Sequence, residues 1–152
     1  MVRVMASGVF DLLHTGHLHY LVEAKKLGDE LVVVVARDST VRREKHEPIT
    51  PENVRRELVD ALKPVDKAVL GKEGDMFEVV EELRPDIIAL GYDQKHDEEA
   101  IKAELKSRGL DVKVVRLSKL GTDLDGTRKI IQKVVSWWKV MSDLEAVEGR
   151  KT

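Results

Sequence analysis

Two histidines, His14 and His17, close the most distinctive segment of the chain. Residues 7–17 read Ser-Gly-Val-Phe-Asp-Leu-Leu-His-Thr-Gly-His. Histidine has an unperturbed pKa of roughly 6.5, so its charge is easily changed near neutral pH. A pair of imidazoles three residues apart can therefore respond to negative charge that builds on a phosphate during a reaction. The alternatives are a polar turn residue beside a first-turn helix residue, or two ligands of a zinc ion.

The position of this segment favours phosphate binding over the alternatives. It follows the apolar run of residues 2–5 and opens an amphipathic stretch, where a first strand passes into a helix. A helix N-terminus offers unpaired N–H groups and the positive end of the helix dipole to an anion. Gly8 precedes Phe10 and Asp11 directly after the strand, and Gly16 lies between the histidines, where a side chain would obstruct the phosphates of a ligand. We therefore expect a catalytic histidine pair at this junction.

Composition limits the classes of protein to which the chain can belong. Its 152 residues suffice for one domain with a real core. The 26 Lys+Arg and 28 Asp+Glu give a net charge of -2, which argues against a dedicated nucleic-acid binder or a polybasic membrane anchor. With no cysteine, disulfides and thiolate chemistry are excluded. The chain shows no signal-peptide pattern and no apolar run of about 20 residues, so we expect a cytoplasmic protein. The 36% of charged residues and the few amides are typical of thermophile proteins.

Apolar runs alternate with segments of helical periodicity along the chain. Continuous apolar runs favour strands of a sheet covered on both faces, and a spacing of three and four favours helices. Strands are predicted over residues 2–6, 31–36, 67–70, 86–90 and 112–115, and helices over 16–27, 51–62, 75–83, 97–108 and 125 to about 138. We expect residues 37–45 to be a mobile basic loop. Thr50 is expected to cap the helix that starts at Pro51.

Strands that alternate with helices indicate an α/β fold, a doubly wound five-stranded parallel sheet. Residues 1–140 are expected to form this domain and residues 141–152 a polar, frayed tail. Ligands of such sheets bind beyond the carboxyl ends of the strands. The segments that follow the strands should therefore face one cleft. Of the adjacent Trp137 and Trp138, we expect one ring to pack on the domain and the other to lie in a homodimer interface.

The segment at residues 7–17 resembles the G-T-F-D-L-L-H-x-G-H signature of the cytidylyltransferase-like nucleotidyltransferases. The similarity runs from Val2 to about Val134. Arg55 stands in the place of a family arginine, and Gly91-Tyr92-Asp93 matches the family's nucleotide-binding turn. Residues 126–130 lie where members carry a Ser/Thr-rich motif. The chain departs from the signature at Val9, which replaces the usual threonine.

The resemblance implies transfer of a nucleoside monophosphate from a triphosphate to a phosphorylated acceptor, with pyrophosphate leaving. Catalysis would consist of positioning and charge stabilisation. The resemblance implies that His14 and His17 hold the α- and β-phosphates, and that Lys45 and Arg55 neutralise phosphate charge. For Lys45 and Arg55 the alternative is ordinary surface charge. The implied nucleotide-binding residues are Gly8, Val9, Phe10, Asp11, His14, Gly16, His17, Gly91, Asp93 and Thr127.

The sequence leaves alternative roles open for three of these residues. Asp11 is expected to orient backbone or a metal-bound phosphate, because a phosphate acceptor needs no general base. Asp93 would bind the ribose or base of the nucleotide, or cap its own loop through an Asx-turn. Thr127 would bond a triphosphate oxygen or cap the last helix.

Within the family, residues 33–38, 61–67 and 85–94 look most like those of the archaeal FAD synthetases, which adenylylate FMN with ATP. The rival interpretations are a glycerol-3-phosphate cytidylyltransferase and a sugar-phosphate adenylyltransferase of the heptose type. A domain that binds nucleotide without turnover is a further alternative. The resemblance implies Mg²⁺ or another divalent cation bound with the nucleotide, and we expect no metal site built from protein side chains.

Overall fold

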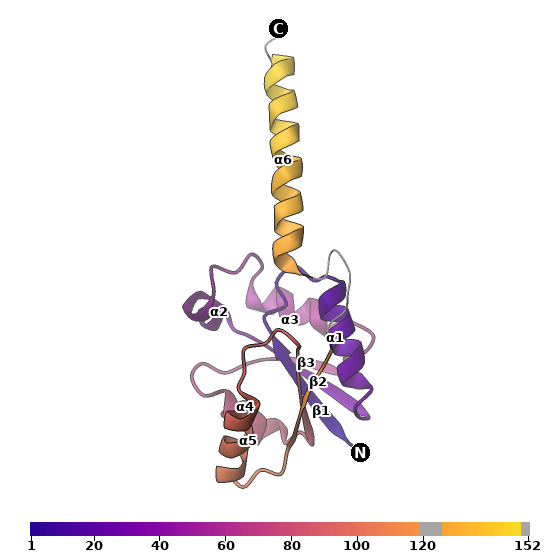
Figure 1. Ribbon diagram of the computed structural model, residues 1–152, viewed down its shortest axis with the longest axis vertical. Coiled ribbons are helices and arrows are strands. Elements are labelled where there is room, and N and C mark those ends of the chain that lie inside the picture. Colours follow the sequence, from indigo (N-terminus) through magenta and orange to yellow (C-terminus); the bar gives the residue numbers. More distant parts are fainter. Residues whose placement is uncertain (119–125, 150–152) are drawn as a thin grey trace.

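A computed structural model describes residues 1–118 and 126–149 of the chain. Strands and helices alternate around one central sheet (Figure 1). The elements in chain order are β1 (Arg3–Gly8), α1 (Thr15–Lys25), β2 (Glu30–Val35), α2 (Asp38–Glu44), α3 (Glu52–Asp60), β3 (Lys67–Leu70), α4 (Met76–Leu83), β4 (Ile87–Leu90), α5 (Glu98–Ser107), β5 (Lys113–Arg116) and α6 (Thr127–Gly149).

The sheet has five strands in the order β3-β2-β1-β4-β5, and every neighbouring pair is parallel. In the central strand, Val4 lies opposite Leu31 of β2 on one side and Ile87 of β4 on the other. The chain adds β2 and β3 on one side of β1 and then β4 and β5 on the opposite side. The predicted doubly wound parallel sheet is confirmed, and its switch point lies between β1 and β4.

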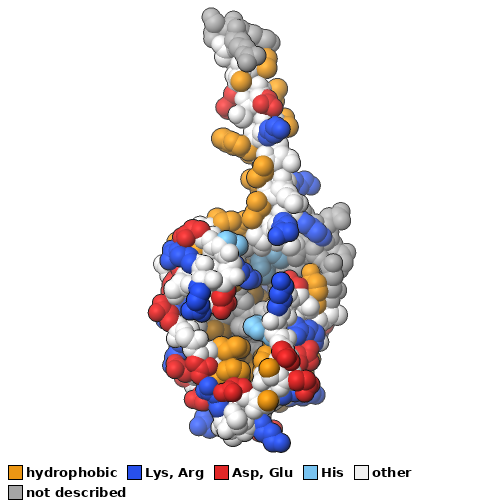
Figure 2. Space-filling view, turned by 60° about the vertical axis from the view of Figure 1, so that its left-hand side comes forward, with side chains coloured by type: hydrophobic (Ala, Val, Ile, Leu, Met, Phe, Trp, Pro, Cys, Tyr) orange, Lys and Arg blue, Asp and Glu red, His pale blue; other side chains and the backbone are white. Residues whose placement is uncertain are grey.

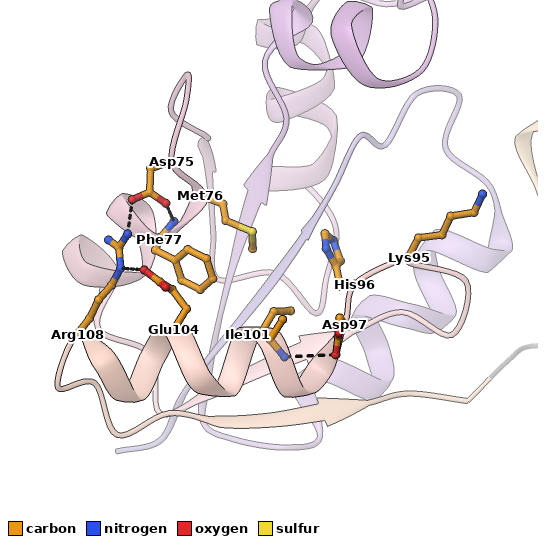
Figure 3. A pocket seen from close by; sticks show the side chains of 10 residues that line it. Asp75, Met76, Phe77, Lys95, His96, Asp97, Ile101, Glu104 and Arg108 are labelled. Carbon is orange, nitrogen blue, oxygen red and sulfur yellow. Dashed lines mark hydrogen bonds and ion pairs between the residues drawn. The ribbon is translucent and has the colours of Figure 1, made fainter.

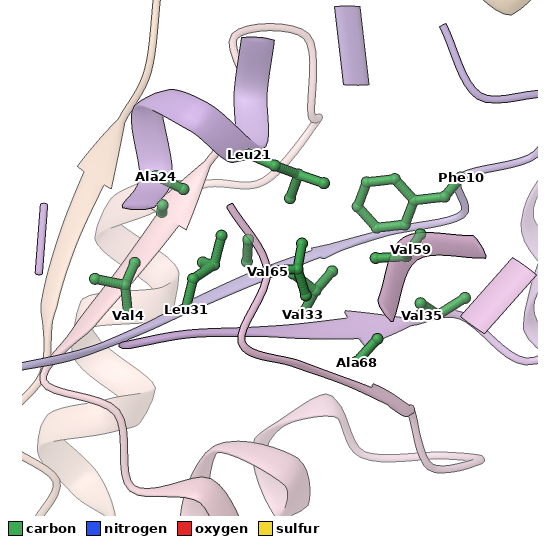
Figure 4. Close-up of a cluster of buried hydrophobic side chains, with 12 residues drawn as sticks. Val4, Phe10, Leu21, Ala24, Leu31, Val33, Val35, Val59, Val65 and Ala68 are labelled. Atoms are coloured by element: carbon green, nitrogen blue, oxygen red, sulfur yellow. The ribbon is translucent and has the colours of Figure 1, made fainter. Parts of the chain in front are cut away.

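Alternate residues of the buried strands divide the core into two layers. Val33 and Val35 pack with Leu21 of α1 and Val59 of α3 on one face (Figure 4). Val34, between them, packs on the other face in a cluster with residues of α4 and α5, such as Val80. Because successive strand side chains point to opposite faces, a fully apolar strand needs helices on both sides. Helices α1 and α3 therefore cover one face, and α4 and α5 the other.

Two predicted details of the segment between β2 and β3 are wrong. The expected basic loop contains a helix, α2, because Val41 is buried at 1% exposure and anchors one side of the turn. The helix α3 begins at Glu52 with Pro51 as its N-cap residue, and no side chain caps it. The hydroxyl of Thr50 instead donates to Asp11 Oδ1 over 2.7 Å. A long-range partner has thus replaced the local cap.

The last helix, α6, differs most from expectation. It runs to Gly149 instead of ending near residue 138, so the expected boundary at residue 140 lies inside a continuous helix. The expected start at Asp125 lies outside the described residues. Helix α6 projects away from the sheet (Figure 1), and none of its residues is buried. Both Trp137 and Trp138 are exposed, at 63% and 66%, so the expectation that one of them packs on the domain is wrong.

A helix that spans a bilayer needs a long, continuously apolar segment. Within residues 1–118 and 126–149, no helix is long and apolar enough to cross a membrane.

Candidate active site

The loop between β1 and α1 holds the two histidine rings against each other. His14 is the N-cap residue of α1, with φ of -144° and ψ of 177°, and its Nδ1 accepts a hydrogen bond from the Gly16 N–H over 3.1 Å. The backbone N–H of His14 donates in turn to Nδ1 of His17 over 3.3 Å. The two rings stack with centroids 3.7 Å apart and an interplanar angle of 24°. The histidine spacing thus builds a reciprocal cap at the helix start.

These backbone hydrogen bonds select the tautomer of each ring. A neutral imidazole has one donor and one acceptor nitrogen, and here Nδ1 of both His14 and His17 is an acceptor. The proton of each neutral ring therefore sits on Nε2. Both rings carry an N–H donor of the kind that bonds a phosphate oxygen.

The backbone before the histidine pair is strained, and the ring of Phe10 occupies the space next to Gly8. Phe10 and Leu12 have positive φ angles of 57° and 56°, a conformation costly for residues with side chains. The buried Phe10 ring lies 5.3 Å from the His17 ring, centroid to centroid. A Cβ added at Gly8 would come within 3.0 Å of the Phe10 ring. Gly8 is thus required by the aromatic side chain that supports His17.

The electrostatic environment of His17 keeps its ring neutral before a ligand arrives. Burial, followed by the charges of His14 and Lys45, lowers the pKa of His17 to about 3, although Asp11 acts in the opposite direction. A polyanion beside the ring would favour its charged form and raise this pKa. His17 is therefore poised to gain positive character only when phosphate charge is present.

Asp11 is tied into the protein by three hydrogen bonds. Its carboxylate accepts from Ile49 N at 2.7 Å, Thr50 N at 3.0 Å and the Thr50 hydroxyl at 2.7 Å. Burial by itself raises the pKa of Asp11, but these hydrogen bonds and the charge of Arg55 outweigh burial and hold the pKa below its ordinary value. The ionised side chain joins the histidine loop to the segment before α3. Of the two expected roles, the structure favours orienting backbone.

Arg55 is fully buried, so the interpretation of this residue as surface charge is wrong. Its guanidinium donates to the carbonyl oxygens of Thr50, Val9 and Ala36 over 3.0, 2.8 and 2.7 Å. It also forms an ion pair with Asp38 at 2.6 Å. These four hydrogen bonds fasten the ends of β1 and β2 to the start of α2. Arg55 therefore holds the loop that carries the histidines.

Lys45 and Asp93, two of the predicted site residues, are exposed. Lys45 is exposed at the end of α2, and its charge contributes to the low pKa of His17. Asp93 is also exposed, while Gly91 is buried and donates its N–H to Gln94 Oε1 over 2.9 Å. Histidine side chains line the hollowed centre of this face, with lysine and arginine side chains around it (Figure 2).

Two residues that sequence reasoning did not single out hold the turn after β4. Gln94 Nε2 donates to Ser7 O over 2.7 Å, which joins this turn to the end of β1. Arg116, the last residue of β5, donates to the carbonyl oxygens of Gly91, Gln94 and His96 over 2.9, 2.7 and 2.8 Å. The available signal was the position of Arg116 at the carboxyl end of a strand, where side chains face the ligand edge of the sheet.

The start of α6 reaches the same loop. The hydroxyl of Thr127 donates to the carbonyl oxygen of Asp11 over 3.2 Å. The segment from β1 to α1 therefore meets residues from the turn after β4, from α3 and from α6. In residues 1–118 and 126–149, no group of three or more His, Asp or Glu side chains is arranged to hold a metal ion.

Comparisons with known proteins identify the family of the chain. The cytidylyltransferase-like family model matches residues 5–147, and the chain belongs to this family. A protein of Aciduliprofundum boonei named FAD synthase is 66% identical over 136 residues, which cover 89% of this chain and 91% of that protein. A FAD synthase of Thermoplasma volcanium is 55% identical over 135 residues, covering 89% of this chain and 95% of that protein.

A solved structure extends the similarity to three dimensions. The crystal structure of a Thermoplasma volcanium protein, described as a lipopolysaccharide core biosynthesis protein, matches with a TM-score of 0.78 and 60% sequence identity. The match covers 79% of this chain and 98% of that one. The predicted family is thus confirmed by the family model and by relatives that span most of the chain.

Proposed function

We propose that this chain is an FAD synthase that transfers AMP from ATP to FMN. An oxygen of the FMN phosphate attacks the α-phosphorus of ATP, a new P–O bond forms, and the bond from the α-phosphorus to the bridging oxygen breaks. The products are FAD and pyrophosphate. Relatives at 66% and 55% identity carry the name FAD synthase, which supports the acceptor and the nucleotide.

The stacked His14–His17 pair is the observation that carries the reaction class. Both rings have Nδ1 engaged with backbone N–H groups, so each neutral ring carries its proton on Nε2, the nitrogen that we assign to phosphate binding. These donors bond oxygens of the α- and β-phosphates, and the bonds strengthen as charge shifts toward the leaving pyrophosphate. Because the pair is held by backbone contacts, little reorganisation accompanies the reaction.

The remaining residues divide into ligand contacts and positioning residues. Lys45, which is exposed, neutralises phosphate charge, and Asp93 and Thr127 contact the nucleotide. Arg55 acts as a positioning residue because its guanidinium is committed to three carbonyl oxygens and Asp38. This positioning role differs from the role that the family resemblance implies for Arg55, which is to neutralise phosphate charge.

Mg²⁺ fits this site as a companion of the triphosphate. The carboxylate of Asp11 is occupied by three hydrogen bonds, so it is poorly suited to supply a metal ligand. Mg²⁺ commonly takes most of its ligands from water and phosphate oxygens, which suits a site with few available carboxylates. When bound, the ion would neutralise charge on the β- and γ-phosphates.

We further propose that the chain is a homodimer joined through α6. Ile130, Val134, Trp137, Met141 and Leu144 recur at spacings of four and three, the pattern of a coiled-coil seam. Val134, Trp137 and Leu144 are 56%, 63% and 55% exposed. Light scattering should show a dimer, Trp137→Glu should give a monomer, and Lys139→Glu should leave the mass unchanged. A monomeric parent protein contradicts the proposal.

A substrate panel tests the activity. The purified protein with Mg²⁺ is offered ATP or CTP together with FMN, glycerol 3-phosphate or a heptose phosphate, and pyrophosphate release is measured. Only ATP with FMN should react, with FAD formed in equal amount to pyrophosphate. Turnover of CTP with glycerol 3-phosphate, or of ATP with the sugar phosphate, would replace this proposal by the corresponding alternative. Binding of nucleotide without any turnover would indicate a sensor.

A further inference from the structure

A hollow opens between α4 and α5, and residues of the segment that follows β4 close one end of it. Its volume is about 440 Å³, within the range of sites for small molecules. Met76 and Phe77, at the start of α4, form one wall, and Ala100 and Ile101 of α5 form the opposite wall. Figure 3 shows Met76 directed into the space between Phe77 and His96. The walls are therefore apolar and the ends polar.

The aromatic wall is held rigidly. The guanidinium carbon of Arg108 lies 5.2 Å from the centroid of the Phe77 ring. Arg108 is itself fixed by Asp75 at 2.6 Å, Glu104 at 2.7 Å and Glu81 at 2.9 Å. One side of the ring is thus covered by a cation that has three carboxylate partners. A rigid aromatic surface with an adjoining thioether suits a flat ring system.

The acidic residues in the lining are neutralised within the protein. Asp75 and Glu104 bind Arg108, and the carboxylate of Asp97 accepts from the N–H groups of Glu99 and Ala100 at the start of α5. The other polar side chains of the lining are Lys95 and His96. An anionic ligand would therefore meet the ammonium group of Lys95 and the imidazole ring of His96 at this end of the hollow.

Gln94, in the turn that carries His96, joins this hollow to the histidine loop, because its Nε2 donates to Ser7 O at the end of β1 over 2.7 Å. The hollow and the histidine loop also share the influence of Lys45. Its charge acts on both His17 and His96 and lowers the pKa of each, after the larger effect of burial. Arg116 fixes the position of His96 through the His96 carbonyl oxygen at 2.8 Å. A ligand whose ring fills the hollow can therefore place a phosphate near Lys45, on the side of His14 and His17.

We propose that the hollow between α4 and α5 is the acceptor subsite, and that it binds the fused aromatic ring system of the flavin between Met76, Phe77 and Ile101. The proposal rests on the proposed function, and it adds the specificity for a flat aromatic acceptor. Glycerol 3-phosphate has no group that would use these walls. The ring lies against α4 and α5, and the ribityl phosphate extends past His96 toward Lys45.

Two substitutions on opposite walls test the subsite. Met76 is 37% exposed, so Met76→Glu places a charge in the apolar wall without removing a core side chain. Ala100 is exposed on α5, and Ala100→Leu fills the hollow from the other side. Each variant should raise KM for FMN by tenfold or more and change KM for ATP less than twofold. Met76→Leu keeps the apolar wall and should behave like the parent protein.

A matched control is available on the other face of the sheet. Leu58 of α3 is 49% exposed, and Leu58→Glu should leave both KM values unchanged. Calorimetric titration with riboflavin, which has the ring but no phosphate, provides a readout without turnover. The parent protein should bind riboflavin, and Met76→Glu and Ala100→Leu should weaken this binding at least tenfold. Thermal unfolding of every variant shows whether a loss comes from the fold.

The outcomes separate the two proposals. If the parent protein makes FAD but both wall variants keep the KM for FMN and the affinity for riboflavin, the subsite is wrong and the FAD synthase activity stands. A rise in KM for ATP instead would assign the hollow to the nucleotide. If the parent protein binds riboflavin in a wall-dependent way but makes no FAD, the activity is wrong and the ring site stands.

Discussion

Two regions of the candidate active site, its floor and its rim, use charged residues in opposite ways. The floor, which we define as residues 8–17 with Thr50 and Arg55, keeps its carboxylate and guanidinium buried and bound to other parts of the protein. The rim, defined as Lys45, Asp93, Lys95 and His96, lies at or near the surface, and its charges are those of Lys45, Asp93 and Lys95. Buried, partnered charges fix geometry, whereas exposed charges act mainly through attraction and are screened by salt. The floor should therefore govern stability and kcat, and the rim KM.

Arg55→Ala should have the largest effect. It leaves Asp38 and three carbonyl oxygens without their partner, and breaking a buried ion pair costs about 3–5 kcal/mol. Urea unfolding should show a loss of this size. Arg42→Ala, at an exposed ion pair of α2, is the control and should change the free energy of unfolding by less than about 1 kcal/mol. Equal losses in the two variants would contradict the structural role of the buried Arg55.

His17→Ala should reduce kcat by roughly 10²–10³, because a preorganised donor to the reacting phosphates is lost. The measurement is pyrophosphate release at saturating ATP and FMN. His19→Ala, in the same helix, is a matched control, since its Nε2 has no hydrogen-bond partner within residues 1–118 and 126–149. Unchanged kcat in His17→Ala would contradict the assignment of the pair to catalysis.

Lys45→Ala should have a smaller effect, a rise of about threefold to fivefold in KM for ATP with little change in kcat, because an exposed charge contributes little. The ratio of the KM values of variant and parent should shrink as salt is raised, since salt screens the attraction that only the parent protein has. Lys63 follows α3 in the sequence and serves as the control, because Lys63→Ala should leave the KM for ATP unchanged. A loss in kcat as large as that of His17→Ala would move Lys45 from the rim to the catalytic residues.

The low pKa of His17 should also make the stability of the floor depend on pH. The pKa of His17 is about 3 in the folded protein and about 6.5 in the unfolded chain, so below pH 6.5 the unfolded state binds the proton that the folded state excludes. The free energy of unfolding should fall as pH drops from 7 to 5, and His17→Gln should flatten part of this slope. His96, whose pKa is also lowered, accounts for another part. Asp11 stays ionised over this range. An identical slope in both proteins would contradict the low pKa.

The sequence alone predicted the strands, the doubly wound sheet and the family. These follow from local features: apolar runs, three-and-four spacing, and the residues of the 7–17 segment. The capping geometry of His14 also follows locally, because its partners are two and three residues away. The predicted ranges of β1 to β5 and of α1, α3, α4 and α5 were correct within two residues at each end for the same reason.

Only the tertiary structure decided the environment of each charge. The sequence gives no sign that Arg55 is buried and Lys45 exposed, because burial depends on partners such as Val9, which lies 46 residues away from Arg55. The same holds for Trp137 and Trp138, whose helix leaves the sheet, and for the hollow between α4 and α5. Local patterns determine which elements form, whereas the packing of distant segments determines which side chains reach a ligand.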